Sequence, residues 1–305
     1  MKKILTIALL LIAINAQGQG LSVPANATLA SLFPDENLRR VVAEHLGPNA
    51  GLVGQRLSDA LVGIEELEAS NRGISDASGI EYLVGLINLE LTDNKLTTIN
   101  ISTLTRLTLL WLDDNNLINL DINDLVNLKT LSITRNMLAN LDFGNNINLE
   151  FISANSNKST NLNINNLTNL TTLNLSDNIL INLNINNLPN LEFLSVSFNR
   201  LTNLYISNLP KLIQLNARSN QLTNLDLSNF ANLVILDVTG NPLASLDISN
   251  LINLERLSIG FTEISQIDVD HNYNLRLITL HEEQRIIIRG RLHPQLSLRR
   301  FPSIG

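Results

Sequence analysis

The sequence contains no cysteine, which excludes a disulfide bond, a thiolate metal site and a thiol nucleophile. Aromatic residues make up only 4% of its 305 residues. No phosphate-binding glycine loop and no serine in a nucleophile-elbow pattern is present, and the histidines follow no metalloenzyme spacing. We therefore expect a protein that is not an enzyme and that binds no cofactor and no metal. The four histidines are His45, His271, His281 and His293.

Long hydrophobic runs are also missing, apart from one at the N-terminus. Lys2 and Lys3 precede the apolar residues 4–14, and small residues follow, which is the pattern of a secretory signal peptide. We expect residues 1–18 to be removed, and the mature chain to be exported without a membrane span. Loss of the two lysines changes the formal charge from −7 to −9, which disfavours a nucleic-acid partner.

The sequence is dominated instead by an internal repeat. Residues 191–211, LEFLSVSFNRLTNLYISNLPK, contain the pattern L-x-x-L-x-[LVI] twice. Within each repeat, leucine-type residues lie 8, 5 and 3 positions before an asparagine and 2 and 5 positions after it. The asparagines recur at intervals of 21 residues without a slip: Asn94, Asn115, Asn136, Asn157, Asn178, Asn199, Asn220 and Asn241.

This spacing predicts a stack of coils with one short strand each. In L-x-x-L-x-L the last two leucines lie on one face of a strand, because strand side chains alternate. One coil cannot bury that face, but stacked coils can, with parallel strands about 4.8 Å apart. The asparagine comes where the chain leaves the strand, and its amide can pair with backbone groups inside the coil. We expect the eight asparagines to form a buried ladder.

The repeat resembles the leucine-rich-repeat family, whose form is L-x-x-L-x-L-x-x-N-x-L. The doubled pattern is similar to the short bacterial nested subclass called IRREKO, and LTNLDLSNF (222–230) and LASLDISNL (243–251) match its second half. This resemblance implies a mainly parallel β-solenoid, with both sides of each coil extended, in a bacterial protein that is secreted or held at the cell surface. It also implies binding of another macromolecule, in adhesion or recognition.

The two ends differ from the repeat and predict caps. Residues 19–63 predict a helical N-terminal cap, with an amphipathic helix at 33–47 and a short helix near 55–63, similar to the cap of internalins. The solenoid should cover residues 64–283, with regular repeats from residue 86. Residues 284–305 predict a C-terminal cap and basic tail, in which residues 286–288 add a last strand and the final arginines are loose.

Outward-facing strand positions supply the candidate binding residues. Trp111 is the one large side chain among small polar residues at its repeat position, and tryptophan is enriched among binding hot spots. A second outward-facing position lies two residues before that of Trp111 in each repeat, and from one repeat to the next it is alternately polar and apolar. Its apolar members should form a row on the sheet, and Phe198 should lie beside this row at the edge of the sheet. The row consists of Leu109, Phe151, Phe193, Ile235 and Leu277.

Acidic residues surround Trp111 in the sequence, namely Glu90, Asp93, Asp113 and Asp114. An apolar patch with an acidic rim favours a basic or amphipathic protein as the partner, with a surface glycan as the second possibility. The competing interpretation is that the row is inherited from a duplicated two-repeat unit and only forms a solvated face. The protein would then be a passive component of an envelope or matrix.

Three further patterns have a functional and a structural interpretation. Acids recur on the second side of the coils, at Asp121, Asp142, Asp226, Asp247 and Asp268, and could bridge calcium or simply be solvated. His271 and His281 fall in adjacent coils and could form a metal or acid–base site. Asn166 and Asn169 begin N-x-S/T triplets, which are either glycan acceptors or consequences of the asparagine-rich composition.

Overall fold

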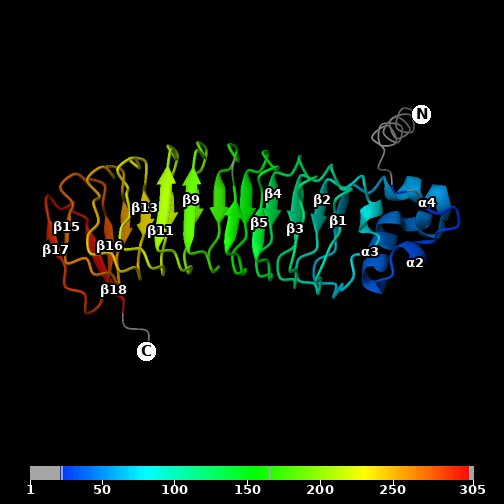
Figure 1. Cartoon of the computed structure of the whole chain (residues 1–305), viewed down its shortest axis with the longest axis horizontal. Coiled ribbons are helices and arrows are strands. Elements are labelled where there is room, and N and C mark those ends of the chain that lie inside the picture. Colours follow the sequence, from blue (N-terminus) through cyan, green and yellow to red (C-terminus); the bar gives the residue numbers. More distant parts are fainter. Residues whose placement is uncertain (1–20, 22, 165, 302–305) are drawn as a thin grey trace.

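The computed structural model describes residue 21, residues 23–164 and residues 166–301. The expected signal peptide, residues 1–18, lies outside the described residues. The chain forms an elongated stack of coils with helices at its N-terminal end (Figure 1). One strand from each coil joins a parallel sheet of 12 strands, which confirms the predicted solenoid with a small helical cap. The strands are, in sheet order, β1 (Glu66–Glu68), β2 (Asn88–Glu90), β3 (Leu109–Trp111), β4 (Thr130–Ser132), β6 (Phe151–Ser153), β8 (Thr172–Asn174), β10 (Phe193–Ser195), β12 (Gln214–Asn216), β13 (Ile235–Asp237), β14 (Arg256–Ser258), β16 (Leu277–His281) and β18 (Ser297–Phe301).

The leucine pattern determines the register of this main sheet. In β3, Leu110 is buried while Leu109 and Trp111 face outward. Leu110 pairs with Leu89 of β2 on one side and with Leu131 of β4 on the other, so the same repeat position aligns from coil to coil. A single continuous core results, because a face that one coil cannot cover is covered by the coils before and after it.

The second side of the coils is less regular than the sequence predicts. Hydrogen-bonded strands form there in six coils of the described chain, as three two-stranded sheets. Two of these strands, β5 and β15, stop at an acidic residue, Asp142 and Asp268, whose carboxylate accepts a hydrogen bond from the backbone N–H two residues later. Asn184 and Tyr205 occupy that position in the longer β9 and β11. The six strands are β5 (Asn140–Asp142), β7 (Asn161–Asn163), β9 (Asn182–Asn186), β11 (Asn203–Ser207), β15 (Gln266–Asp268) and β17 (Ile287–Arg289).

The eight repeat asparagines lie in a buried column, each with 1–8% of its surface exposed. The Asn115 side-chain nitrogen donates to the carbonyl of Leu91 in the preceding coil at 2.9 Å and to that of Leu112 in its own coil at 3.1 Å. Its oxygen accepts from the Leu96 N–H at 3.0 Å. Each member therefore satisfies backbone groups of two coils at a turn that neither coil can pair internally.

A second asparagine column lies on the surface and was not predicted. Its members end the repeats, and each donates its side-chain N–H to a backbone carbonyl 22 residues earlier, in the preceding coil. Their donor–acceptor distances run from 2.8 Å for Asn190 to 3.2 Å for Asn169. The asparagine-rich composition thus serves coil-to-coil bonding twice in most of the regular repeats. The members are Asn127, Asn148, Asn169, Asn190, Asn232, Asn253 and Asn274.

The described part of the N-terminal cap contains four short helices, and Asp35 attaches the cap to the solenoid. One Asp35 carboxylate oxygen caps α3 by accepting the Asn37 and Leu38 N–H groups, and the other accepts the Ser75 N–H at 3.0 Å. Burial alone would raise the pKa of Asp35, but its four backbone hydrogen bonds outweigh burial and lower it. The helices are α2 (Leu29–Leu32), α3 (Glu36–Leu46), η1 (Gly47–Gly51) and α4 (Gly54–Leu61), and η2 (Ile80–Tyr82) follows β1.

The C-terminal end is more ordered than the sequence predicts. Ile287 lies in the expected extra strand, but that strand, β17, pairs with β15 on the second side. The arginine-rich residues form β18, which pairs with β16 and extends the main sheet by one strand. The asparagine ladder is replaced here by Thr262, which donates to the Ile259 carbonyl at 2.8 Å and accepts from Gln284 at 3.1 Å. Gln284 belongs to the next coil, and it therefore supplies part of the hydrogen bonding that an asparagine of the ladder supplies in the regular coils.

Candidate functional site

Trp111 occupies the outward face of the main sheet near its N-terminal end, and 37% of its surface is exposed. In the register of the sheet it lies between Glu90 of β2 and Ser132 of β4. Its neighbours along this row are therefore one carboxylate and one hydroxyl, neither of which covers the indole. The sheet thus presents a large apolar side chain to solvent where the other coils present polar ones.

The apolar row lies on the same face, on every second strand of the main sheet. Phe151 is the most exposed member at 36%, and the other four are half-buried. Polar residues on the intervening strands separate the members, so the row is interrupted by Thr130, Thr172, Gln214 and Arg256. Phe198 lies beyond the end of β10 with 52% of its surface exposed, and the Arg218 guanidinium lies 5.7 Å from its ring centre.

The four acids around Trp111 have different roles in the structure. Asp113 accepts hydrogen bonds from the Ser132 hydroxyl at 2.7 Å and from the Thr134 N–H at 2.6 Å. Asp114 forms an ion pair of 2.8 Å with Arg135. Asp93 takes a positive φ of 55° in the turn after β2. Only Glu90 points from a strand beside Trp111, so it is the acid best placed to meet a partner there.

Glu90 belongs to an acidic patch that the sequence alone did not predict. Glu68 of β1 pairs with it in register, and Glu66 lies two residues earlier on the same strand. Partial burial raises the pKa of Glu90, and repulsion from Glu68 and Glu66 raises it further. A cationic group placed against these three carboxylates would relieve that repulsion. The acidic patch, Glu66, Glu68 and Glu90, therefore favours a basic group beside Trp111.

The middle of the outward face is occupied by hydrogen bonds of the protein with itself. The Asn174 side-chain oxygen accepts from the Ser176 hydroxyl at 2.7 Å, and that hydroxyl also contacts the Ser195 hydroxyl at 2.7 Å. Ser195 is only 3% exposed. These polar groups satisfy one another along the sheet, so this stretch has little unmet hydrogen-bonding capacity to offer a partner.

The acids on the second side act as local turn residues. Each carboxylate accepts a backbone N–H two residues later, as Asp226 does from Ser228 and Asp247 from Ser249, both at 2.9–3.0 Å. These bonds lower the pKa of Asp226 and Asp247. Within residues 21, 23–164 and 166–301, no three histidine, aspartate or glutamate side chains lie close enough to share a metal ion.

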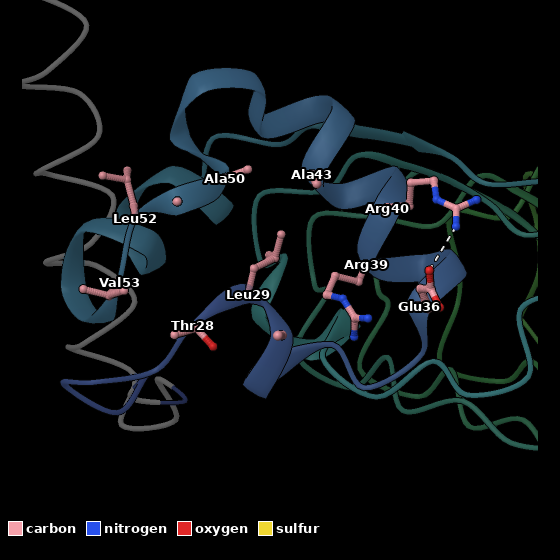
Figure 2. A pocket seen from close by; sticks show the side chains of 11 residues that line it. Thr28, Leu29, Glu36, Arg39, Arg40, Ala43, Ala50, Leu52 and Val53 are labelled. Atoms are coloured by element: carbon pink, nitrogen blue, oxygen red, sulfur yellow. Dashed lines mark hydrogen bonds and ion pairs between the residues drawn. The ribbon is translucent and has the colours of Figure 1, made fainter.

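The helical cap contains a cleft of about 530 Å³ between α2, α3 and the loop after η1 (Figure 2). Its charged residues are already engaged: Arg40 pairs with Glu36 at 3.2 Å, and Arg39 donates to the carbonyls of Phe33 and Pro34. Thr28, whose hydroxyl accepts the Ser31 N–H, also lines the cleft, and the other lining residues are aliphatic or glycine. The cleft therefore presents no free acid–base pair. No helix in the described part of the chain combines the length and the apolar character that crossing a bilayer requires.

The stacked parallel coils, the buried leucine rows and the asparagine column define a leucine-rich-repeat solenoid. No family model and no curated protein matches the sequence. Solved structures match it, among them the functional domain of InlJ from Listeria monocytogenes, which includes a cysteine ladder. That match has a TM-score of 0.79 and 28% identity, and it covers 91% of this chain and 64% of the InlJ domain.

Two other solved structures extend the comparison. InlC2, an internalin of L. monocytogenes, has a TM-score of 0.58 at 27% identity, over 86% of this chain and 100% of its own. A chain from the octameric complex of latrophilin 3, Unc5D and the leucine-rich-repeat protein FLRT2 has a TM-score of 0.61 at 20% identity, over 80% of this chain and 85% of that one. The chain thus has a leucine-rich-repeat fold similar to that of the internalins, and it spans just under two thirds of the InlJ domain.

Proposed function

We propose that this chain is an exported, non-enzymatic protein that binds a protein partner through the outward face of its main sheet, in adhesion or recognition. One observation carries the proposal: Trp111 is exposed in register beside Glu90, whose pKa is raised by neighbouring carboxylates. The partner's contact region is basic or amphipathic. The apolar row and Phe198 extend the contact, with Asp93, Asp113 and Asp114 at its rim.

Other observations support this proposal. The FLRT2 structure is a complex of a leucine-rich-repeat protein with two other proteins, and internalins are the bacterial structures that this chain resembles. The lysine-led apolar start of the sequence supports export to the bacterial surface or medium. The nested repeat of 21 residues supports assignment to the IRREKO-like subclass. A surface glycan remains the second candidate ligand, since the same exposed aromatic rings can stack on sugars.

The first prediction concerns the aromatic contact. We expect the double variant Trp111→Ala/Phe151→Ala to lose partner binding by at least about 30-fold, because a buried aromatic hot spot contributes about 2 kcal/mol or more. Wild type and variant should be immobilised and exposed to surface extracts of bacteria and of host cells. Captured proteins are then identified by mass spectrometry, and their affinities are measured by surface plasmon resonance.

A matched control removes apolar surface elsewhere. Ile147→Ala/Tyr273→Ala deletes two exposed side chains, 51% and 61% accessible, that lie away from the outward face of the main sheet. This variant should bind as wild type does. If the control and the Trp111 variant capture the same proteins with equal strength, the proposed surface is wrong. If no protein is captured, a passive envelope or matrix role replaces the binding role.

The second prediction separates stability from binding at Glu90. Because the pKa of Glu90 is raised in the folded protein, the folded state holds more protons than the unfolded state just above the usual glutamate pKa, so stability falls as pH rises through that window. We expect Glu90→Gln to stabilise the fold at pH 7 by about 0.2–1 kcal/mol, the usual scale of a like-charge cross-strand pair. The same change should weaken binding of a basic partner.

The measurement combines thermal unfolding at pH 4, 5 and 7 with partner binding at pH 7. The stabilisation should shrink as pH falls, because the wild-type carboxylate becomes protonated. Glu192→Gln provides the control, since this exposed glutamate is not adjacent to the acidic patch. A Glu90→Gln variant that binds the partner more tightly than wild type would show that the partner is not basic at this position.

A further inference from the structure

A second cavity lies at the opposite end of the main sheet from Trp111. It has a volume of about 380 Å³ and forms where β13, β14, β16 and β18 end. We refer to it as the C-terminal pocket. None of the partner-binding residues predicted from the sequence lines it, and of the other candidates only His281 does. The side chains that matter for its chemistry are Arg218, Asp237, Phe261, Leu280, His281 and Phe301.

Phe261 has a costly backbone conformation. It lies at the turn position three residues after the end of β14, where φ is positive in every regular coil, and its own φ is 54°. A left-handed conformation costs a non-glycine residue about 1–2 kcal/mol and is least suited to bulky side chains. Most coils have Asp, Ser, Arg or Gly here, and only Phe198 and Phe261 are aromatic. Phe261 is 49% exposed, so burial gives little compensation.

A strained and exposed aromatic residue is better explained by function than by stability. Phe301, at the end of β18, is also aromatic and 48% exposed. The His281 ring lies 4.0 Å from the Phe261 ring, and His281 pairs in register with Phe301, so three rings from three successive coils line one side of the pocket. Leu280, which is 1% exposed, forms the apolar base of the pocket. This side of the pocket fits a large apolar side chain.

The pocket also contains buried polar atoms that lack partners in the described part of the chain. These are Arg218 Nε and His281 Nε2. Elsewhere on the outward face the polar side chains bond to one another, as Ser176 and Ser195 do. A buried donor without a partner costs about 1–3 kcal/mol, so an unpaired group in a folded protein calls for an explanation. A ligand carboxylate would accept from Arg218 Nε, and it would accept from His281 Nε2 in the tautomer that carries the proton on that nitrogen.

The charges around the pocket favour an anionic ligand. Asp237, its one carboxylate, already accepts the Thr239 N–H at 2.9 Å. A neighbouring cavity of about 360 Å³ is lined by Arg256, Arg276 and Arg299 together with Glu255. Positive charge therefore predominates at this end of the sheet, whereas the acidic patch lies at the other end. The two ends of one face differ in the sign of their charge.

We propose that the C-terminal pocket binds an acidic peptide segment of a protein partner, with a carboxylate against Arg218 and His281 and an adjacent large apolar side chain between Phe261 and Phe301. Charge-assisted hydrogen bonds from Arg218 supply the polar recognition, and the aromatic walls supply the apolar recognition. This site borders the Trp111 surface at Phe198, whose ring centre lies 5.7 Å from the Arg218 guanidinium, but it is separate from Trp111 and the acidic patch and selects the opposite charge.

The test is a selection of random nine-residue peptides displayed on phage against the wild-type protein, followed by affinity measurement with the enriched peptides. Two variants remove the pocket chemistry: Arg218→Gln and Phe261→Asn. Asparagine tolerates a positive φ, so Phe261→Asn should melt at the wild-type temperature or above while losing peptide binding. Ser156→Asn makes the same kind of change at the equivalent turn of a distant coil and serves as the control.

We expect enriched peptides that contain Asp or Glu next to Phe, Trp, Tyr or Leu, with binding at least tenfold weaker to both pocket variants and unchanged in the control. No enrichment, enriched peptides without an acid, or equal binding to Phe261→Asn would overturn the proposal. Basic peptides that depend on Glu90 would support the Trp111 surface alone. Binding of a glycan on an array, lost in Phe261→Asn, would assign the pocket to a sugar instead.

Discussion

Replacing Asn178 with alanine is expected to lower the free energy of unfolding by about 3 kcal/mol, because several buried backbone groups lose their partner at once. The Asn178 side-chain nitrogen donates to the carbonyls of Ala154 and Leu175 at 3.0 and 3.1 Å, and its oxygen accepts the Ser159 N–H at 2.9 Å. Alanine leaves all three groups inside the coil, where water cannot replace the amide. Urea unfolding followed by circular dichroism measures the loss.

Asn190→Ala is the matched control for this prediction. Asn190 belongs to the surface column, lies in the same repeat and donates one hydrogen bond of 2.8 Å to the Thr168 carbonyl, which water can satisfy after the substitution. Its loss should cost about 0.5–1 kcal/mol. If the two alanine variants unfold at the same urea concentration, the buried column contributes no more than the exposed one, and the stabilising role assigned to the ladder is wrong.

The sequence predicted the parts of the fold that repeat. An interval of 21 residues determines which leucines are buried and which asparagines stack, because each coil lies on an equivalent coil. The outward direction of Trp111 follows from the same strand alternation. No comparable rule applies where the repeat ends. The arginine-rich segment that forms β18 has no equivalent repeat, so its pairing with β16 could not be predicted from periodicity.

The parts of the candidate sites that the sequence missed depend on contacts outside the regular interval. Glu68 and Glu90 are 22 residues apart, one more than the repeat, so only the observed register places their carboxylates side by side. Asp35 reaches Ser75 across 40 residues. The C-terminal pocket combines a turn residue, Phe261, with Phe301 from a strand that was not predicted. Aromatic residues at the turn position after the strand were visible in the sequence and are the signal that could have indicated it.

The middle and the two ends of the outward face therefore differ in how fully their polar groups are hydrogen-bonded or charge-paired. In the middle, Ser176 and its neighbours bond to one another and stabilise the sheet. At the N-terminal end carboxylates repel one another beside Trp111, and at the C-terminal end Arg218 Nε is buried without a partner. The repulsion at the N-terminal end and the unpaired donor at the C-terminal end both lower the stability of the free protein, and under the two proposals a bound partner offsets these losses. A partner that contacts both ends would need a basic region and an acidic region separated by most of the length of the solenoid.

The junction between the cap and the solenoid is also expected to be highly sensitive to a single substitution. Gly79 has a φ of 100°, and a Cβ there would lie 2.3 Å from the Leu32 carbonyl oxygen and 2.7 Å from Phe33 Cδ1. Both contacts are impossible without displacing the end of α2 from η2. Because Phe33 is fully buried, its displacement would open the first coil to water. Gly79→Ala should therefore cost about 4 kcal/mol, the scale of severe core disruption.

Gly73→Ala separates this clash from the effect of backbone conformation. Gly73 also has a positive φ, 68°, but a Cβ there would meet only Asn37 Nδ2 at 3.9 Å. Its substitution should cost about 1–2 kcal/mol from the left-handed backbone alone. Hydrogen exchange at the amides of α3 gives the decisive comparison: exchange should accelerate strongly in Gly79→Ala and little in Gly73→Ala. Equal acceleration would mean that the cap is held by backbone conformation near residues 73–79 and not by close packing of Gly79 against Leu32 and Phe33.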